Sequence, residues 1–270
     1  MDTGLKDKVV FITGASGGIG TAVARLLAAE GARLVLHGHK GHERAAALAE
    51  RLPGDHLVVI ADMAREDQVE AAFAAALAHW GQLDVLVANA GIWPEQAAPV
   101  HEMTLERWQQ VMDVNLTGVF LSIRAFFRHL ARRRPPAAAL ILMGSTAAMF
   151  GEEGHADYAA GKAAITHGLT MSLKNEIVRL SPGGRVNAVC PGWTRTPMAA
   201  AGLKDDDAVR GVLQTRSLTK IAEPEDVAAA VVYLASPVLA GHVSGQILTV
   251  AGGMEGRLLH RACAVNPSQA

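Results

Sequence analysis

The chain has 270 residues, of which 50% are hydrophobic and only 4% are aromatic. Its 25 Lys and Arg residues nearly balance its 26 Asp and Glu residues, and the net charge of −1 excludes general attraction to nucleic acid or to an anionic membrane. The two cysteines, Cys190 and Cys263, form no C-x-x-C motif, which argues against a disulfide framework or a zinc site. Because the N-terminus lacks a signal-peptide core and no apolar stretch reaches about 18 residues, we expect a cytoplasmic protein.

Short apolar runs alternate along the chain with segments of helical periodicity. The runs predict strands over 8–13, 33–37, 56–61, 84–88, 139–144, 185–190 and 246–250, and the periodic segments predict helices over 19–30, 41–51, 65–80, 104–132, 156–180 and 224–235. This alternation predicts βαβ units and a parallel sheet with helices on both faces. We expect one α/β domain over residues 1–253, followed by a C-terminal tail over 254–270.

The first predicted strand runs into a glycine-rich turn that opens the first predicted helix. The turn reads Thr13-Gly14-Ala15-Ser16-Gly17-Gly18-Ile19-Gly20. Gly14 would permit a tight turn, Gly18 would let the backbone approach a phosphate, and Gly20 would let the helix pack closely on the strand. Because a helix N-terminus binds phosphate through its N–H groups and dipole, the turn predicts a dinucleotide site that includes Ser16 and Ile19.

The same turn contains the pattern G-x-S-x-G, which is typical of the nucleophile in some hydrolases. In those enzymes the serine projects from a sheet whose earlier strands are already in place. Here Ser16 follows the first strand, so the sequence disfavours a hydrolase.

A phenol and an ammonium lie four residues apart in Tyr158-Ala-Ala-Gly-Lys162, and Ser145 lies thirteen residues upstream. Residues at i and i+4 share one face of a helix. We therefore expect Lys162 to stabilise the phenolate and to lower the pKa of Tyr158 from its usual value of about 10. A tyrosine with a pKa near neutrality would serve as a proton donor and acceptor.

In combination, the glycine turn, Ser145 and Tyr158-x-x-x-Lys162 resemble the short-chain dehydrogenase/reductase family, in its single-domain branch. Asn89-Ala90-Gly91, Asn115 and Pro191-Gly192 extend the resemblance, which covers residues 5–253. It implies a doubly wound Rossmann fold with a seven-stranded parallel sheet in the order 3-2-1-4-5-6-7. The cofactor would then bind at the topological switch between strands 1 and 4.

The resemblance implies that four residues form the catalytic set for hydride transfer between a nicotinamide and a carbonyl or secondary alcohol. Tyr158 would exchange the proton, Lys162 would also bond the nicotinamide ribose, and Ser145 would stabilise charge on the substrate oxygen. Asn115 matches the position that anchors a water linking the lysine to solvent. The alternative is a non-catalytic dinucleotide-binding regulator of the same fold, which the intact set of four disfavours.

The resemblance also implies contacts to the two ends of the cofactor. Asn89, Ala90 and Gly91 would approach the adenosine half, Asp62 with Met63 beside it would contact the adenine, and Thr194 after Pro191 and Gly192 would contact the nicotinamide amide. Tyr158 and Lys162 would lie against the same nicotinamide ribose.

The choice of dinucleotide depends on the end of the second predicted strand, where NAD-specific sites carry an acidic residue. This chain has Gly38 there. His39 and Lys40 follow and would hold a 2′-phosphate, so NADP(H) is favoured, with NAD(H) as the alternative. One residue favours NAD(H): Gly17 stands where many NADP-dependent relatives have arginine.

His37, His39 and His42 lie close together in the sequence. Their spacing fits no standard metal site, so we expect no metal.

The candidate substrate contacts are Trp93, His155 and Trp193. They belong to bulky, mostly apolar segments, which suits an aliphatic or cyclic carbonyl. Residues 194–216 form a long excursion at the carboxyl edge of the sheet and predict a lid, with a surface hairpin that does not move as the alternative.

The chain also resembles 3-oxoacyl-[acyl-carrier-protein] reductases, which implies a 3-oxoacyl thioester as a candidate substrate and an acidic carrier protein as a candidate partner. Arg132-Arg133-Arg134 and Arg179 match basic positions in those reductases, although arginines at helix ends also suit the helix dipole. Helices 104–132 and 156–180 carry apolar stripes that relatives bury between subunits. We therefore expect a homotetramer or homodimer.

Overall fold

The computed structural model describes residues 2–258 and contains one seven-stranded parallel sheet. The strands are β1 (Val9–Ile12), β2 (Arg33–Gly38), β3 (His56–Ile60), β4 (Val85–Ala88), β5 (Ala137–Met143), β6 (Gly183–Pro191) and β7 (Ile247–Val250). Their order is β3-β2-β1-β4-β5-β6-β7, which confirms the predicted doubly wound fold. β1 pairs with both β2 and β4, so the chain direction across the sheet reverses there.

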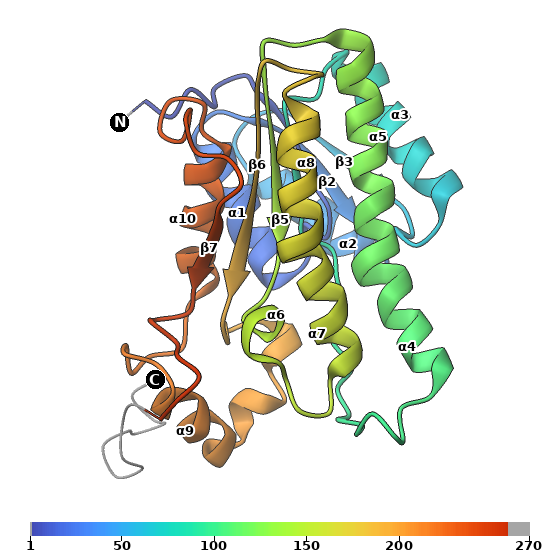
Figure 1. Ribbon diagram of the computed structural model, residues 1–270. Helices are drawn as coiled ribbons and strands as arrows, with labels where there is room; N and C mark the ends of the chain where they lie inside the picture. The colour runs from blue at the N-terminus through green and yellow to red at the C-terminus, as the bar shows by residue number, and fades with distance from the viewer. Residues whose placement is uncertain (1, 259–270) are drawn as a thin grey trace.

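Helices cover both faces of the sheet (Figure 1). The helices α1 (Gly18–Ala29), α2 (His42–Arg51) and α10 (Pro224–Ala235) share one apolar cluster with Val10 and Ile12 of β1. On the other face, α3 (Glu66–Trp80), α5 (Gly118–Arg133) and α8 (Thr170–Ile177) share a second cluster with Val9 and Phe11. Successive residues of a strand point to opposite faces, so burial on both faces explains why the strands read as continuous apolar runs.

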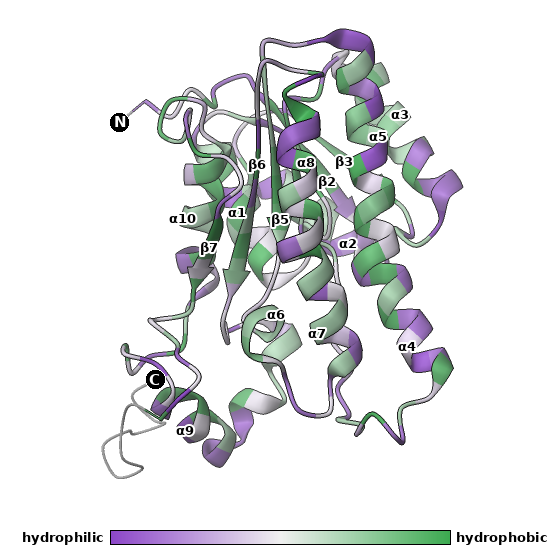
Figure 2. Ribbon diagram, viewed as in Figure 1, coloured by the Kyte–Doolittle hydropathy of each residue, from purple (hydrophilic) through white to green (hydrophobic). Residues whose placement is uncertain are grey.

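The colouring in Figure 2 agrees with this layering: β5 is hydrophobic along its length, and the outer ends of α3, α4 and α5 carry hydrophilic residues. Within residues 2–258, no helix combines the length and the apolar character that crossing a membrane requires.

The two longest predicted helices are each interrupted by a π-helical turn. The first consists of α4 (Leu105–Met112), the turn η1 (Asp113–Thr117) and α5, and the second of α7 (Ala156–Ala163), the turn η2 (Ala164–Leu169) and α8. The structure is helical without a gap over Leu105–Arg133 and Ala156–Ile177, close to the predicted 104–132 and 156–180, but the sequence did not predict the π-helical turns. Apolar periodicity does not distinguish a single i→i+5 turn from its α-helical surroundings, and such turns are frequent at functional sites.

Residues 194–216 lie at the carboxyl edge of the sheet and contain short helices. These are η3 (Pro197–Ala199), η4 (Gly202–Lys204) and α9 (Asp206–Gln214), and a further unpredicted helix, α6 (Ala147–Phe150), lies nearby. Asp205 caps α9 by accepting hydrogen bonds from the N–H groups of Asp207 and Ala208. Because α9 buries Val209 and Leu213 against Trp193, this segment has its own small apolar cluster.

Candidate functional site

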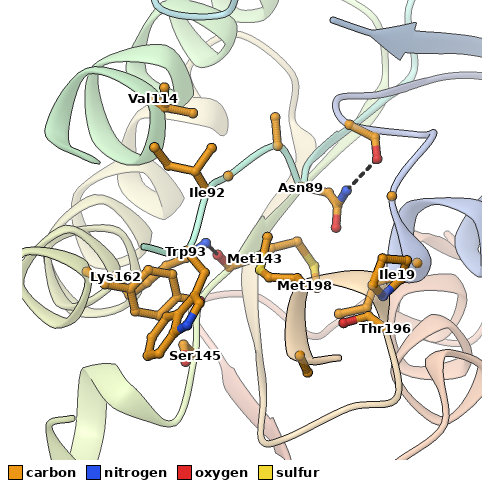
Figure 3. A pocket seen from close by; sticks show the side chains of 18 of the residues that line it. Ile19, Asn89, Ile92, Trp93, Val114, Met143, Ser145, Lys162, Thr196 and Met198 are labelled. Atoms are coloured by element: carbon orange, nitrogen blue, oxygen red, sulfur yellow. Dashed lines mark hydrogen bonds between the residues drawn. The ribbon is translucent and has the colours of Figure 1, made fainter. Parts of the chain in front are cut away.

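A cavity of about 1580 Å³ opens at the carboxyl ends of the strands, where β1 and β4 diverge. Every residue that the sequence analysis places at the cofactor lines this cavity. Its volume exceeds the roughly 300–1,000 Å³ of ordinary small-molecule sites, so there is room for a long ligand beside a second molecule. Figure 3 shows Ile19, Asn89 and Thr196 on one side, and Trp93, Ser145 and Lys162 on the other.

Thr13 and Asn89 tie β1 to β4 at the point of divergence. The Thr13 hydroxyl accepts hydrogen bonds from the N–H groups of Asn89 and Ala90, both at 2.9 Å. In return, Asn89 Nδ2 donates to the carbonyl oxygens of Thr13 at 2.9 Å and Gly14 at 3.1 Å (Figure 3). The mouth of the cavity is therefore held on both sides by one pair of side chains.

The glycine turn leaves the N-terminus of α1 facing this mouth. Gly14 has a φ of +67°, which favours glycine, and a Cβ on Gly20 would lie 2.2 Å from the Gly14 carbonyl oxygen. The N-cap residue is Gly17, which has no side chain to bond the first N–H groups of the helix. The turn therefore fits a pyrophosphate, because those N–H groups stay available to an anion.

Basic and hydroxyl groups converge at the corner beyond β2. Ser16, His39, Lys40 and Arg44 line it. A Cβ built on Gly41 would lie 2.7 Å from Ser16 Oγ and 2.8 Å from Arg44 Nη2, so this hydroxyl and this guanidinium flank the same point. Sequence reasoning missed Arg44. Arg44 could have been found from its place in the first turn of α2, which follows Gly38 and Gly41 and would therefore lie beside the 2′ position of a bound dinucleotide.

His37 has a structural role instead of a metal-binding one. Its Nδ1 accepts a hydrogen bond from the Gly14 N–H at 3.0 Å, and its Nε2 lies 2.9 Å from the Ala61 carbonyl oxygen. Burial lowers the pKa of His37, which favours the neutral ring that this pair of bonds requires. Residues 2–258 hold no group of three or more side chains suited to a metal ion.

Three of the four residues expected to be catalytic line the cavity together: Ser145, Tyr158 and Lys162. Ser145 follows β5, and its Oγ accepts a hydrogen bond from the Ala147 N–H at 3.1 Å. Tyr158 and Lys162 lie on α7. Lys162 Nζ donates to the Met143 carbonyl oxygen at 2.7 Å and lies 5.7 Å from the centre of the Tyr158 ring.

Asn115 lies in η1 behind the cavity and is fully buried. Its Oδ1 accepts from the Ile92 N–H at 2.7 Å, and its Nδ2 donates to the Ile92 carbonyl oxygen at 2.9 Å. Both ends of the side-chain amide are thus bonded to the backbone of Ile92, and the role of Asn115 in anchoring a water beside Lys162 stays a prediction. The side chain holds the loop that follows Asn89-Ala90-Gly91.

Burial controls the protonation of Tyr158 and Lys162. It raises the pKa of the Tyr158 phenol to about 12, against the opposing effect of a hydrogen bond with Ser145. It lowers the pKa of the Lys162 ammonium to about 8. The expectation that Lys162 lowers the pKa of Tyr158 is thus wrong for this structure, because desolvation of the phenolate dominates. At neutral pH the phenol keeps its proton and is able to donate it.

Two aromatic rings stand beside the phenol at the other end of the cavity. Trp93 stacks on His155, with ring centres 3.8 Å apart and an angle of 13°, and it meets Tyr158 edge-on at 4.8 Å. The ring nitrogens of His155 lie 3.0 Å from the Pro94 carbonyl oxygen and 3.1 Å from that of Glu153. The position of this flat wall is thus set by bonds to two loops.

The segment that follows β6 lines another side of the cavity. Thr194 Oγ1 donates to the Gly192 carbonyl oxygen at 2.9 Å, and Pro191, Gly192 and Thr194 all line the cavity. Trp193 lines it as well and packs on η4, since a Cβ on Gly202 would lie 2.8 Å from its ring. Of the predicted substrate contacts, Trp93 and His155 form one wall, and Trp193 packs against the apolar cluster of Val209 and Leu213.

A protein-family model described as "Enoyl-(Acyl carrier protein) reductase" matches residues 14–255. The chain is 39% identical over 255 residues to cis-4-hydroxycyclohexanecarboxylate dehydrogenase of Sinomonas cyclohexanicum, covering 94% of this chain and 98% of the relative. It is 38% identical over 253 residues to 3beta-hydroxysteroid dehydrogenase 1 of Eggerthella lenta, covering 93% and 94%. The crystal structure of levodione reductase superimposes with a TM-score of 0.84 at 31% identity, covering 92% of this chain and 97% of that one.

The buried ammonium predicts a pH-dependent stability without cofactor. The pKa of Lys162 is about 8 in the folded chain against 10.5 ordinarily, so the unfolded chain binds the extra proton between these values and the free energy of unfolding rises with pH across that window. Lys162→Met should remove this rise, which amounts to about 3 kcal/mol in total. Urea unfolding at pH 7, 8 and 9 measures the onset of this rise, below the pH of about 10 at which the Tyr158 phenol of the unfolded chain loses its proton.

Lys204→Met, at the exposed end of η4, is the control and should keep the wild-type slope. A difference between wild type and Lys162→Met that stays constant with pH would contradict the burial argument.

Proposed function

The chain belongs to the short-chain dehydrogenase/reductase family and is a hydride-transferring oxidoreductase, and on that premise we propose that it uses NADP(H) and acts on an uncharged ring ketone or ring alcohol. The observation that carries the proposal is the meeting of Ser145, Tyr158 and Lys162 in one cavity with the glycine turn. The matched relatives are named as dehydrogenases and give no support to a non-catalytic regulator.

The preference for NADP(H) is supported by charge at the corner beyond β2. Lys40 and Arg44 line the cavity there, and the end of β2 has Gly38 in place of a carboxylate. Guanidinium and ammonium groups bind phosphate through charge-assisted hydrogen bonds, and no acidic side chain at 38 would repel a 2′-phosphate. NAD(H) is the alternative, because Gly17 stands where many NADP-dependent relatives have arginine.

In the proposed reduction, the nicotinamide supplies the hydride to the carbonyl carbon when it is bound. Tyr158 gives its phenolic proton to the carbonyl oxygen, which becomes the hydroxyl of the product. Ser145 donates a hydrogen bond to the same oxygen and stabilises the charge that develops on it. Lys162, held by the Met143 carbonyl oxygen, places positive charge beside the phenolate that is left.

The class of substrate is proposed from the wall and the charges around the phenol. Trp93 and His155 present a flat aromatic wall beside Tyr158, which suits a ring. Glu95 and Glu152 line this end, and the charge of Glu152 contributes to the raised pKa of Tyr158. Among the described residues that line the cavity, the Lys and Arg side chains are Lys40, Arg44 and Lys162, so none faces the substrate end apart from the catalytic lysine.

This charge pattern distinguishes between the two activities named for the relatives. Both named relatives carry a ring alcohol in their names, and one of those substrates is also a carboxylate. A carboxylate would meet Glu95 and Glu152 without a dedicated counter-charge. An uncharged ring is therefore the better match for this chain.

A 3-oxoacyl thioester on a carrier protein is the second candidate, and a relative from Synechocystis sp. named 3-oxoacyl-[acyl-carrier-protein] reductase, 35% identical over 255 residues, supports it. The arginines expected to bind the carrier lie close together, since Arg134 Nη1 donates to the Arg179 carbonyl oxygen. They stand at the amino end of β5, whereas Ser145 follows its carboxyl end. Because β5 spans 7 residues, or roughly 20 Å, a carrier bound there would not face the cavity of the same chain.

Self-association is proposed from apolar side chains exposed on the helices beside the site. Phe120 of α5 is 45% exposed and Met171 of α8 is 39% exposed. Their burial against a second copy would remove large apolar groups from water, which supports a homodimer or homotetramer.

Tyr158→Phe tests the mechanism directly. The phenylalanine keeps the ring that Trp93 contacts but has no proton to give, so kcat for ketone reduction should fall about 10²- to 10⁴-fold while the affinity for NADPH stays unchanged. Steady-state kinetics and fluorescence titration of NADPH measure the two quantities. A variant that reduces ketones at the wild-type rate would refute the role of the phenol.

Arg44→Met tests the choice of cofactor. Loss of one charge-assisted bond to a 2′-phosphate should raise KM for NADPH about tenfold and leave KM for NADH unchanged. Arg51→Met, at the far end of the same helix, is the matched control and should change neither. An equal effect of Arg44→Met on both cofactors would show that Arg44 does not read the 2′ position.

A matched pair of ketones tests the substrate class. The methyl ester of 4-oxocyclohexanecarboxylic acid should be reduced with a kcat/KM at least about tenfold higher than the free carboxylate, because only the carboxylate is repelled by Glu95 and Glu152. Glu152→Gln should narrow the ratio. If wild type prefers the carboxylate, or reduces only 3-oxoacyl thioesters, the uncharged-ring proposal fails while the family assignment stands.

A further inference from the structure

Arg107 joins three segments around the substrate end of the cavity. Its Nε donates to Asp157 Oδ2 at 2.9 Å, its Nη1 to the Gln96 carbonyl oxygen at 2.6 Å and its Nη2 to the Gly154 carbonyl oxygen at 2.9 Å. Arg107 lies in the first turn of α4, and its own N–H is capped by Thr104 Oγ1 at 3.2 Å. The guanidinium therefore extends from the capped end of α4 and holds two loops and a second helix, α7.

Asp157 connects this arginine to the catalytic helix. It is the second residue of α7, its side chain is completely buried, and its Oδ1 accepts a hydrogen bond from the Tyr158 N–H at 2.8 Å. A carboxylate in the first turn of a helix also interacts favourably with the helix dipole. The backbone position of Tyr158 is thus set by a side chain whose other oxygen is bound to Arg107.

The two loops that Arg107 holds are themselves joined and carry the wall of the substrate end. The Ala98 N–H donates to the Gly154 carbonyl oxygen at 2.9 Å, and His155 Nε2 lies 3.0 Å from the Pro94 carbonyl oxygen. Loop 94–98 follows Trp93, and loop 151–155 ends in His155, so the stacked pair depends on both loops.

We infer that Arg107 and Asp157 are positioning residues that set the phenol of Tyr158 and the Trp93–His155 wall at a fixed distance from each other. Neither residue belongs to the glycine turn or to the corner beyond β2, so they act on the substrate end and leave the cofactor end unchanged. This inference rests on the proposed function for its kinetic readout. A displacement of about 1 Å between reacting groups is enough to lower a rate about 100-fold.

Two variants separate the contribution of Arg107 and Asp157 to the stability of the fold from their effect on the position of Tyr158 and the aromatic wall. Arg107→Met alone leaves a buried carboxylate without its partner, which destabilises a fold strongly. The double variant Arg107→Met/Asp157→Asn removes both charges, and the asparagine oxygen is still able to accept from the Tyr158 N–H. It should therefore regain most of the thermal stability that the single variant loses. It does not regain the three-way bridge, because a methionine bonds neither carbonyl oxygen.

The experiment compares wild type, Arg107→Met and the double variant in thermal stability, NADPH affinity, kcat and hydrogen–deuterium exchange. For the double variant we expect near-wild-type stability and NADPH affinity, a kcat lowered about 10- to 100-fold, and faster exchange in residues 94–98 and 151–158 but not in residues 14–20. Arg124→Met is the matched control. Arg124 forms ion pairs with Glu66 and Glu70 away from the cavity, so kcat and exchange at both loops should stay as in wild type.

Recovery of kcat together with stability in the double variant would overturn the inference, because the pair would then serve only to hold the fold. Unchanged exchange in both loops would overturn it as well. If wild type itself reduces no ketone, the proposed function fails, and the exchange measurement still decides whether Arg107 and Asp157 hold the two loops.

Discussion

The reciprocal hydrogen bonds between Thr13 and Asn89 are the constraint on which the site depends. β1 and β4 are neighbours in the sheet, yet the chain leaves them toward opposite faces. At this point the sheet offers no further strand to satisfy the backbone, and the two side chains satisfy it instead. The gap they hold open lies beside the glycine turn, so the place for a dinucleotide follows from the strand order and two side chains.

The same device recurs around the cavity. Asn115 bonds both backbone groups of Ile92, and Arg107 bonds the carbonyl oxygens of two loops. These two polar side chains thus fix the positions of loops through hydrogen bonds to the backbone. Lys162 also bonds a carbonyl oxygen, that of Met143, but it lines the cavity beside the Tyr158 ring. Rigid loops around a few reactive groups that line the cavity match the needs of an enzyme that must place a hydride and a proton on one carbonyl.

Much of this architecture was predictable from the sequence, because the signals are local. Continuous apolar runs mark strands buried on both faces, and three glycines in one turn mark close backbone contacts. The remaining features depend on contacts between distant segments. The π-helical turn at Asn115, the convergence of Arg44 on Ser16 and the bridge from Arg107 to Asp157 have no signature in spacing. The pKa of Tyr158 was predicted in the wrong direction because spacing reveals a neighbouring charge but not the degree of burial.

The central claim is that the gap between β1 and β4 holds a nicotinamide dinucleotide with its reactive ring at Tyr158. A crystal structure of the protein with NADPH tests it most directly. We predict the pyrophosphate on the turn from Gly14 to Gly20 and the nicotinamide ring between Tyr158 and Thr194. A dinucleotide bound outside this gap, or bound in reverse with its adenine at Tyr158, would contradict the account.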